Sequence, residues 1–188
     1  MVRGAAVDFE MSGMNLGALD KALAAEGKRE QVYALLTPEA RAAFQSPHSA
    51  RWHPGRFGVE AWLAIVKLGG KPWLEELNYQ LTRKSFGPIV GPLVKIALTL
   101  SGSSPAAVFA RLGDTTSVAL RGVVFEWKPA DPKSGALTIT YPSAIPPEVV
   151  EPGWRGVIRV GSELTEKTIR VDRFEPENER RFRFEVSW

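Results

Sequence analysis

The chain has 188 residues, 44% of them hydrophobic and 24% charged, which is the balance of an ordinary globular protein. This length fits a single domain, which can bury roughly two-thirds of its unfolded surface. The absence of cysteine excludes disulfides, thiolate catalysis and cysteine-ligated metals, and it suits the reducing cytoplasm. The net charge of +3 is mild, so nucleic-acid binding is a minor alternative. No apolar run is long enough to predict a membrane span.

Helical periodicity dominates the first half of the chain, after a short strand predicted at residues 2–9. Thr37 and Pro38 form a cap and first-turn pair for one helix. The pair Gly69-Gly70 ends a strongly apolar helix, and Pro72 starts the next one. The predicted helices cover a leucine-spaced stretch that stops at Gly27, residues 30–36, 37–44 and 59–68, and the stretch that begins at Pro72 and carries Trp73, Leu77 and Leu81.

An irregular segment at residues 45–58 interrupts these helices. It is rich in proline and glycine, and it holds both histidines, His48 and His53. We therefore expect both histidines to lie in a solvated loop.

The segment at residues 85–112 differs from the other helical stretches because it contains no acidic residue. Its apolar residues cover more than one helical face, and a helix of this kind is usually buried. We expect Ile89, Leu93 and Val94 to lie in the core. A second, short helix begins at Ser104-Pro105 and is closed by Gly113.

After Gly113 the apolar period changes from about 3.6 to 2, which predicts strands. Residues 118–127 and 136–141 read as a hairpin with a long loop, and residues 146–165 as a helix that glycines and prolines weaken. A final hairpin joins residues 168–174 to 180–188. On its last strand the alternation predicts that one face is buried, and this face carries Phe182, Phe184, Val186 and Trp188.

Because strands and helices do not alternate singly, a doubly wound parallel sheet is disfavoured. The predicted fold class is α+β: a helical layer packed on an antiparallel sheet, in a single domain. The helical part covers about residues 15–112. The sheet part covers about residues 116–188 and includes the N-terminal strand.

This order of elements resembles an uncharacterised paralogous family that is expanded in myxobacteria. The resemblance rests on RGAAVDF near the start, on residues 86–112 running into TSVALRGVVFEW, and on RFRFEVSW at the end. More remotely, the layout is similar to the fold shared by haem-nitric-oxide-binding domains, 4-vinyl-reductase-type sensor domains and some TRAPP vesicle-tethering subunits. That resemblance implies either a small-molecule or lipid pocket or a dimeric assembly role.

Two departures from these remote relatives concern their metals. The resemblance implies metal-binding cysteines near the C-terminus in the sensor-type domains, and residues 172–188 have none. It implies an axial histidine on a helix and a tyrosine-serine-arginine cluster in the haem binders, and neither is found in this sequence. We therefore expect no haem, no zinc and no other cofactor.

The sequence also lacks recognisable catalytic motifs, which predicts that the chain is not an enzyme. His48 and His53 have no acidic or further histidine partners nearby, as a metal or general-base site requires. Replacement of both histidines by alanine should leave the function intact. The carboxylates Glu75 and Glu76 lie on a polar helix face, where solvated charge is usual.

The aromatic load is the feature that points to function, since six of the residues are tryptophan. We expect Trp62, Trp73, Phe86 and Ile89 to line a pocket or a self-association face, although a plain core role is the simpler alternative. The favoured function is a non-catalytic interaction or assembly module that binds itself as a homodimer or binds another protein. The alternative is a sensory domain that holds an apolar small molecule.

Overall fold

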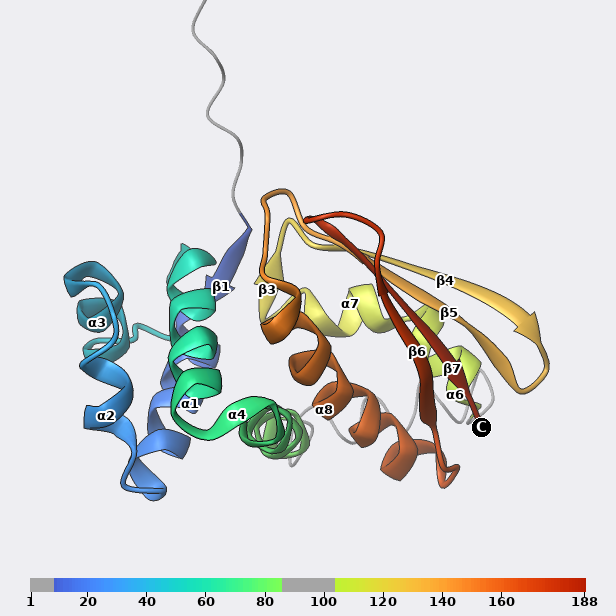
Figure 1. The fold of residues 1–188 in the computed structure, drawn as a ribbon, viewed down its shortest axis with the longest axis horizontal. Coiled ribbons are helices and arrows are strands. Elements are labelled where there is room, and N and C mark those ends of the chain that lie inside the picture. The colour runs from blue at the N-terminus through green and yellow to red at the C-terminus, as the bar shows by residue number, and fades with distance from the viewer. Residues whose placement is uncertain (1–8, 86–103) are drawn as a thin grey trace, which may run out of the picture.

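The computed structural model describes residues 9–85 and 104–188, and its helices and strands form two parts that meet along a central line (Figure 1). The helical part contains α1 (Gly13–Ala25), α2 (Arg29–Tyr33), α3 (Pro38–Gln45) and the first half of α4 (Arg56–Ser85). The second part contains α6 (Pro105–Ala110), α7 (Leu112–Thr116), α8 (Pro147–Thr165) and a four-stranded sheet. Helices and antiparallel sheets thus form a single α+β domain, as predicted.

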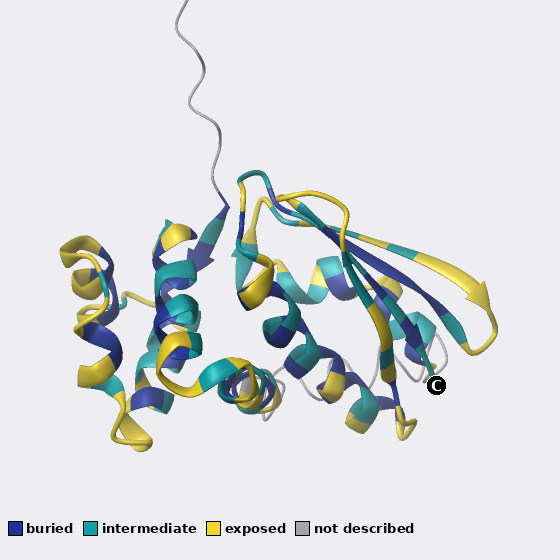
Figure 2. Ribbon diagram, viewed as in Figure 1, coloured by how far each residue is buried: buried dark blue, intermediate teal, exposed yellow. Residues whose placement is uncertain are grey.

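The four-stranded sheet has the order β4-β5-β7-β6, and each pair of neighbouring strands is antiparallel. Its strands are β4 (Val124–Asp131), β5 (Ser134–Thr140), β6 (Arg170–Pro176) and β7 (Arg181–Ser187). Phe182 and Phe184 of β7 lie opposite Ile139 and Leu137 of β5, and all four are buried. The two central strands are accordingly the most buried of the sheet (Figure 2), and the predicted burial of Phe182, Phe184 and Val186 is confirmed.

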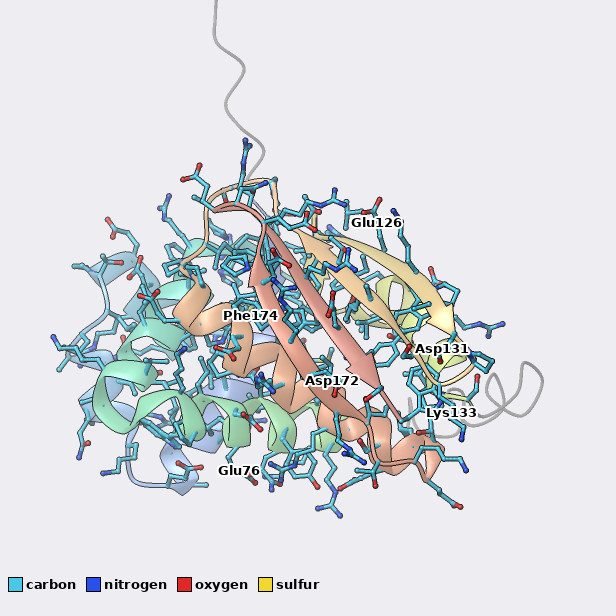
Figure 3. All side chains as sticks on the ribbon, turned by 45° about the vertical axis from the view of Figure 1, so that its right-hand side comes forward. Glu76, Glu126, Asp131, Lys133, Asp172 and Phe174 are labelled. Atoms are coloured by element: carbon cyan, nitrogen blue, oxygen red, sulfur yellow. The ribbon has the colours of Figure 1, made fainter. Side chains whose placement is uncertain are left out.

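The outer face of this sheet is polar. Arg181 contacts Glu126 at 3.1 Å across the strands, and Arg183 contacts Glu185 at 3.3 Å. Glu126 lies on the edge strand β4 (Figure 3). These pairs are exposed, so each contributes little to stability.

A second, three-stranded sheet was not predicted. It has the order β2-β1-β3 and consists of β2 (Trp52–Pro54), β1 (Glu10–Ser12) and β3 (Leu120–Arg121). Strand β1 therefore pairs with one strand from each half of the chain and joins no strand of the large sheet. The predicted strand at residues 2–9 lies outside the described residues, apart from Phe9, which precedes β1 directly.

Helix α4 bends at Gly70, where φ is 79° and ψ is 174°. Only glycine adopts this conformation readily, and Pro72 then restarts the helix. The predicted break between two helices is thus confirmed as a kink. The half of α4 that follows the kink packs against α8. A Cβ on Gly156 of α8 would lie 2.4 Å from the carbonyl oxygen of Glu75 on α4. Glycine is therefore required for this close helix crossing.

Several local predictions are confirmed and others are wrong. The hydroxyl of Thr37 caps α3 by accepting from the amide of Ala40, and α8 covers the stretch predicted as a weak helix. The prediction of a long loop between the strands of this hairpin is wrong, because β4 ends at Asp131 and β5 begins at Ser134. Oxygens of Asp131 instead accept from the Lys133 amide at 2.7 Å and the Ser134 hydroxyl at 2.5 Å, which closes a short turn. Asp131 and Lys133 lie at the tip of this hairpin (Figure 3).

Two further expectations have a partial outcome. The strand predicted at residues 118–127 is divided into β3 and β4. The burial predicted for Ile89, Leu93 and Val94 falls outside the described residues. None of the described helices is long and apolar enough to cross a bilayer.

Candidate functional site

Five aromatic side chains meet where the helical part contacts the large sheet, and we call them the aromatic junction. The ring of Tyr141, just after β5, contacts Phe9 at a centroid distance of 5.3 Å and Phe182 at 6.1 Å, both edge to face. Trp154 of α8 contacts Phe125 of β4 at 5.1 Å in the same manner. Residues from β4, β7, α8, the end of β5 and the start of β1 thus build one cluster.

A buried hydrogen bond connects the two halves of the aromatic junction. The indole N–H of Trp154 donates to the phenol oxygen of Tyr141 at 2.8 Å. Tyr141 is 2% exposed and Trp154 is 6% exposed, so this bond is shielded from water. A buried hydrogen bond of this kind fixes the orientation of both rings.

The phenol of Tyr141 keeps its proton. Burial raises its pKa well above the ordinary value, and this effect outweighs the Trp154 hydrogen bond, which lowers the pKa. Among the described residues no group accepts this phenol proton.

The segment after Tyr141 is held by the β6–β7 turn. The amide of Tyr141 donates to the carbonyl of Arg180 at 2.8 Å, and the amide of Ile145 donates to that of Glu179 at 2.9 Å. The exposed guanidinium of Arg180 reaches the Pro142 carbonyl at 3.5 Å. The Arg180 side chain therefore lies beside the segment that carries Tyr141 and Ser143. No charged side chain is buried among the described residues.

The predicted site residues are only partly placed. Trp62 and Trp73 are half-buried on opposite sides of the α4 kink, and both pack against the core. The indole of Trp73 donates to Glu26 at 2.7 Å, which ties the kink to the end of α1. Phe86 and Ile89 lie outside the described residues. Whether these four residues bind anything stays a prediction.

The aromatic junction was missed by sequence reasoning. Tyr141 was assigned to a strand with one buried face, and Trp154 lay in the stretch with the weakest helical pattern. A usable signal existed, since both residues combine an aromatic ring with a polar atom, which requires a partner when buried.

The prediction that both histidines lie in a loop is confirmed for His48 and wrong for His53. His48 lies in a loop, but His53 lies on β2 opposite Met11, on the same face of the small sheet as Phe9. Its Nε2 atom is buried and has no partner. Burial lowers the pKa of His53, and the nearby Arg51 and His48 lower it further. Within the described residues no group of three histidine or carboxylate side chains could hold a metal ion.

A second candidate, the polar groove between α4 and α8, is lined by paired charges. Glu151 contacts Lys71 at 3.1 Å and Arg155 at 3.2 Å, and Glu76 contacts Arg159 at 2.9 Å. The groove has a volume of about 380 Å³. Because these acids and bases neutralise one another, the groove has little charge left for a ligand.

Comparison with known proteins identifies the fold. The structure is similar to the unliganded Fe(II) H-NOX protein from K. algicida, with a TM-score of 0.70 and 10% sequence identity over 94% of this chain and 96% of that chain. The chain has the H-NOX fold. A second H-NOX protein, from S. oneidensis in the Fe(II)NO ligation state, matches with a TM-score of 0.65 and 8% identity over 94% and 98% of the two chains.

A third H-NOX structure, from work on heme distortion in that family, matches with a TM-score of 0.60 and 11% identity over 95% of each chain. At such identities the likeness shows the H-NOX fold alone. No protein-family model and no curated protein matches the sequence. The resemblance to a myxobacterial family therefore stays a prediction, whereas the remote resemblance to haem-nitric-oxide-binding domains is confirmed for the fold.

Proposed function

We propose that this chain is a non-catalytic sensory domain that binds one small molecule at the aromatic junction. The observation that carries the proposal is the H-NOX fold over almost the full length of the chain. The Fe(II) and NO in the H-NOX structures belong to those proteins, and their fold supports ligand binding as a role for this one. This proposal favours the sensory alternative over the assembly role that the sequence favoured.

The aromatic junction supports the proposal from within the chain. Phe9 precedes β1 in the helical part, whereas Tyr141 and Trp154 belong to the sheet part. A ligand that contacted this cluster would touch both parts at once. Ligand sites of this kind are mostly apolar, with a few polar groups that fix orientation, and the phenol of Tyr141 is such a group.

The residues of this chain do not fit haem. A histidine that binds iron donates its other ring nitrogen to a carboxylate, a carbonyl or water. His53 has a free buried Nε2, but the side chains that shift its pKa are Arg51 and His48, and no described carboxylate is bonded to it. Ligand binding in this chain is therefore argued without iron.

Native mass spectrometry of the purified full chain tests the proposal. We expect an adduct of one small molecule per chain that is lost when the protein is denatured. A chain that carries no adduct, and whose melting temperature no apolar metabolite raises, would contradict a sensory role. The same spectra report the oligomeric state, so they also test the homodimer, which stays a prediction.

A further inference from the structure

Haem proteins commonly bind iron through histidine, cysteine, methionine or tyrosine, and this chain has few of these residues. The sequence has no cysteine, two histidines, three methionines and three tyrosines. Of the residues that the structure does not describe, 86–103 contain none of these types, and 1–8 contain Met1 alone. All of these side chains except Met1 therefore lie in the described part of the chain.

The tyrosines are engaged as protonated phenols. Tyr33 donates to Asp20 at 2.6 Å and Tyr79 donates to Glu163. Tyr141 accepts from Trp154. Iron would require a phenolate, and burial raises the pKa of both Tyr33 and Tyr141. Each tyrosine is therefore a hydrogen-bonding group in this fold.

The methionines are unsuited for a different reason. The Met11 side chain is packed against α4 so closely that a Cβ at Gly58 would lie 2.4 Å from its terminal carbon and 2.9 Å from its sulfur. Met14 is 53% exposed on α1, so its sulfur lies at the surface. Neither sulfur is free to face a ligand between the two parts of the fold.

Of the two histidines, His48 is exposed in a loop, whereas His53 has a buried ring nitrogen without a partner. Burial lowers the pKa of His53 most, and the nearby Arg51 and His48 lower it further. A ferric haem brings a further positive charge to the iron, which this environment opposes. It also brings propionates, and no basic side chain is buried among the described residues to receive them.

Resting on the proposed function, we infer that the ligand of the aromatic junction is an uncharged organic molecule with a hydrogen-bond acceptor, held without haem or another metal. Its acceptor takes the proton of the Tyr141 phenol, and its apolar surface contacts the surrounding rings. The buried side chains among the described residues are aromatic, aliphatic or uncharged polar, so a charged ligand would lose its hydration among them without compensation.

Two probes test the inference on the full chain. The first is haemin at equimolar ratio, followed by excess apomyoglobin to remove loosely held haem. The second is Prodan, an uncharged naphthalene dye with one ketone whose emission reports hydrogen bonding and polarity. We expect apomyoglobin to remove all the haem, and Prodan to bind saturably at one per chain.

Matched variants locate the Prodan site. Tyr141→Phe keeps the ring and removes the phenol proton, so Prodan affinity should fall about three- to tenfold, the worth of one hydrogen bond. Tyr33→Phe is the matched control, because the phenol of Tyr33 lies on α2 outside the aromatic junction and donates to Asp20, and this variant should bind Prodan within about twofold of the wild type. Circular dichroism and melting curves confirm that both variants are folded. Equal affinities for wild type and Tyr141→Phe would overturn the assignment of the acceptor to this phenol.

The haemin experiment tests this inference separately from the proposed function. A Soret band that survives apomyoglobin would overturn the inference, and its loss in His53→Ala would identify the iron ligand. If haemin is removed and Prodan also fails to bind, the assignment of an uncharged organic ligand is overturned, whereas an adduct in the native mass spectrum would still support the proposed sensory function.

Discussion

The aromatic junction and the polar groove between α4 and α8 both join distant segments, yet they satisfy their polar groups in opposite ways. In the groove, Glu151 and Glu76 each have a basic partner within 3.2 Å. In the junction, the Tyr141 phenol accepts one hydrogen bond and has no described acceptor for its own proton. The pairing of Glu76 and Glu151 is typical of a structural contact, whereas a buried donor without a described acceptor is where a ligand would add a hydrogen bond.

The largest effect expected is loss of packing at the junction. Phe182 is fully buried between Tyr141 and Phe174, so Phe182→Ala should lower the free energy of unfolding by about 3–5 kcal/mol. Urea denaturation measures this change. Glu185→Ala, on the outer face of the same strand, is the control and should cost less than about 1 kcal/mol. Equal costs for the two variants would refute the register of β7.

A second test concerns the groove, where the helices cross closely. Gly156→Ala would place a Cβ 2.4 Å from the Glu75 carbonyl oxygen and 2.8 Å from the Tyr79 amide nitrogen. Both of these atoms belong to the rigid backbone of α4. The helices must then separate, at a cost of about 1–3 kcal/mol. The control is Gly153→Ala in the same helix, where the new Cβ would meet only an atom of Asn78 at 3.9 Å. This change should be neutral or stabilising by up to about 1 kcal/mol.

The pH dependence of stability tests His53, which lies on the same face of the small sheet as Phe9. Its folded pKa lies below the ordinary value of 6.5, mainly through burial and further through Arg51 and His48. Below pH 6.5 the unfolded chain therefore binds more protons than the folded chain, so stability falls as the pH drops through the folded pKa. His53→Gln should flatten this part of the profile. A profile that keeps its slope in His53→Gln would assign the effect to another group.

The smallest effect is expected from the ion pairs that distinguish the groove. Lys71 and Glu151 are partly exposed and 3.1 Å apart. A double-mutant cycle with Lys71→Met and Glu151→Gln should give a coupling of about 0.2–1 kcal/mol that weakens with added salt. A coupling several times larger would show that this ion pair stabilises the fold more than a solvent-exposed pair does.

Much of the fold could be predicted because its patterns are local. The strict alternation from Arg181 to Ser187 fixed which face of β7 is buried, and the Thr37-Pro38 pair fixed the start of α3. Strand β2 could not be predicted, since it is three residues long and contains a proline. Its extended conformation depends on pairing with β1, which is distant in sequence.

The aromatic junction could not be predicted from the sequence, because it is built from tertiary contacts. The bond between Trp154 and Tyr141 forms because α8 packs across the inner face of the sheet, and no residue spacing encodes that crossing. Phe9 reaches Tyr141 only because β1 pairs with β3 from the other half of the chain. The tryptophan count pointed to aromatic surface as the functional feature, but it selected Trp62 and Trp73 rather than Trp154.

The most direct test of a haem-free H-NOX fold is the absorption spectrum of the full chain purified from cells supplied with a haem precursor. Because no described side chain is suited to bind haem iron, we expect no Soret band, together with an organic adduct in the native mass spectrum of the same sample. A Soret band in proportion to the protein, retained through gel filtration, would contradict both this expectation and the role assigned to the Tyr141 phenol.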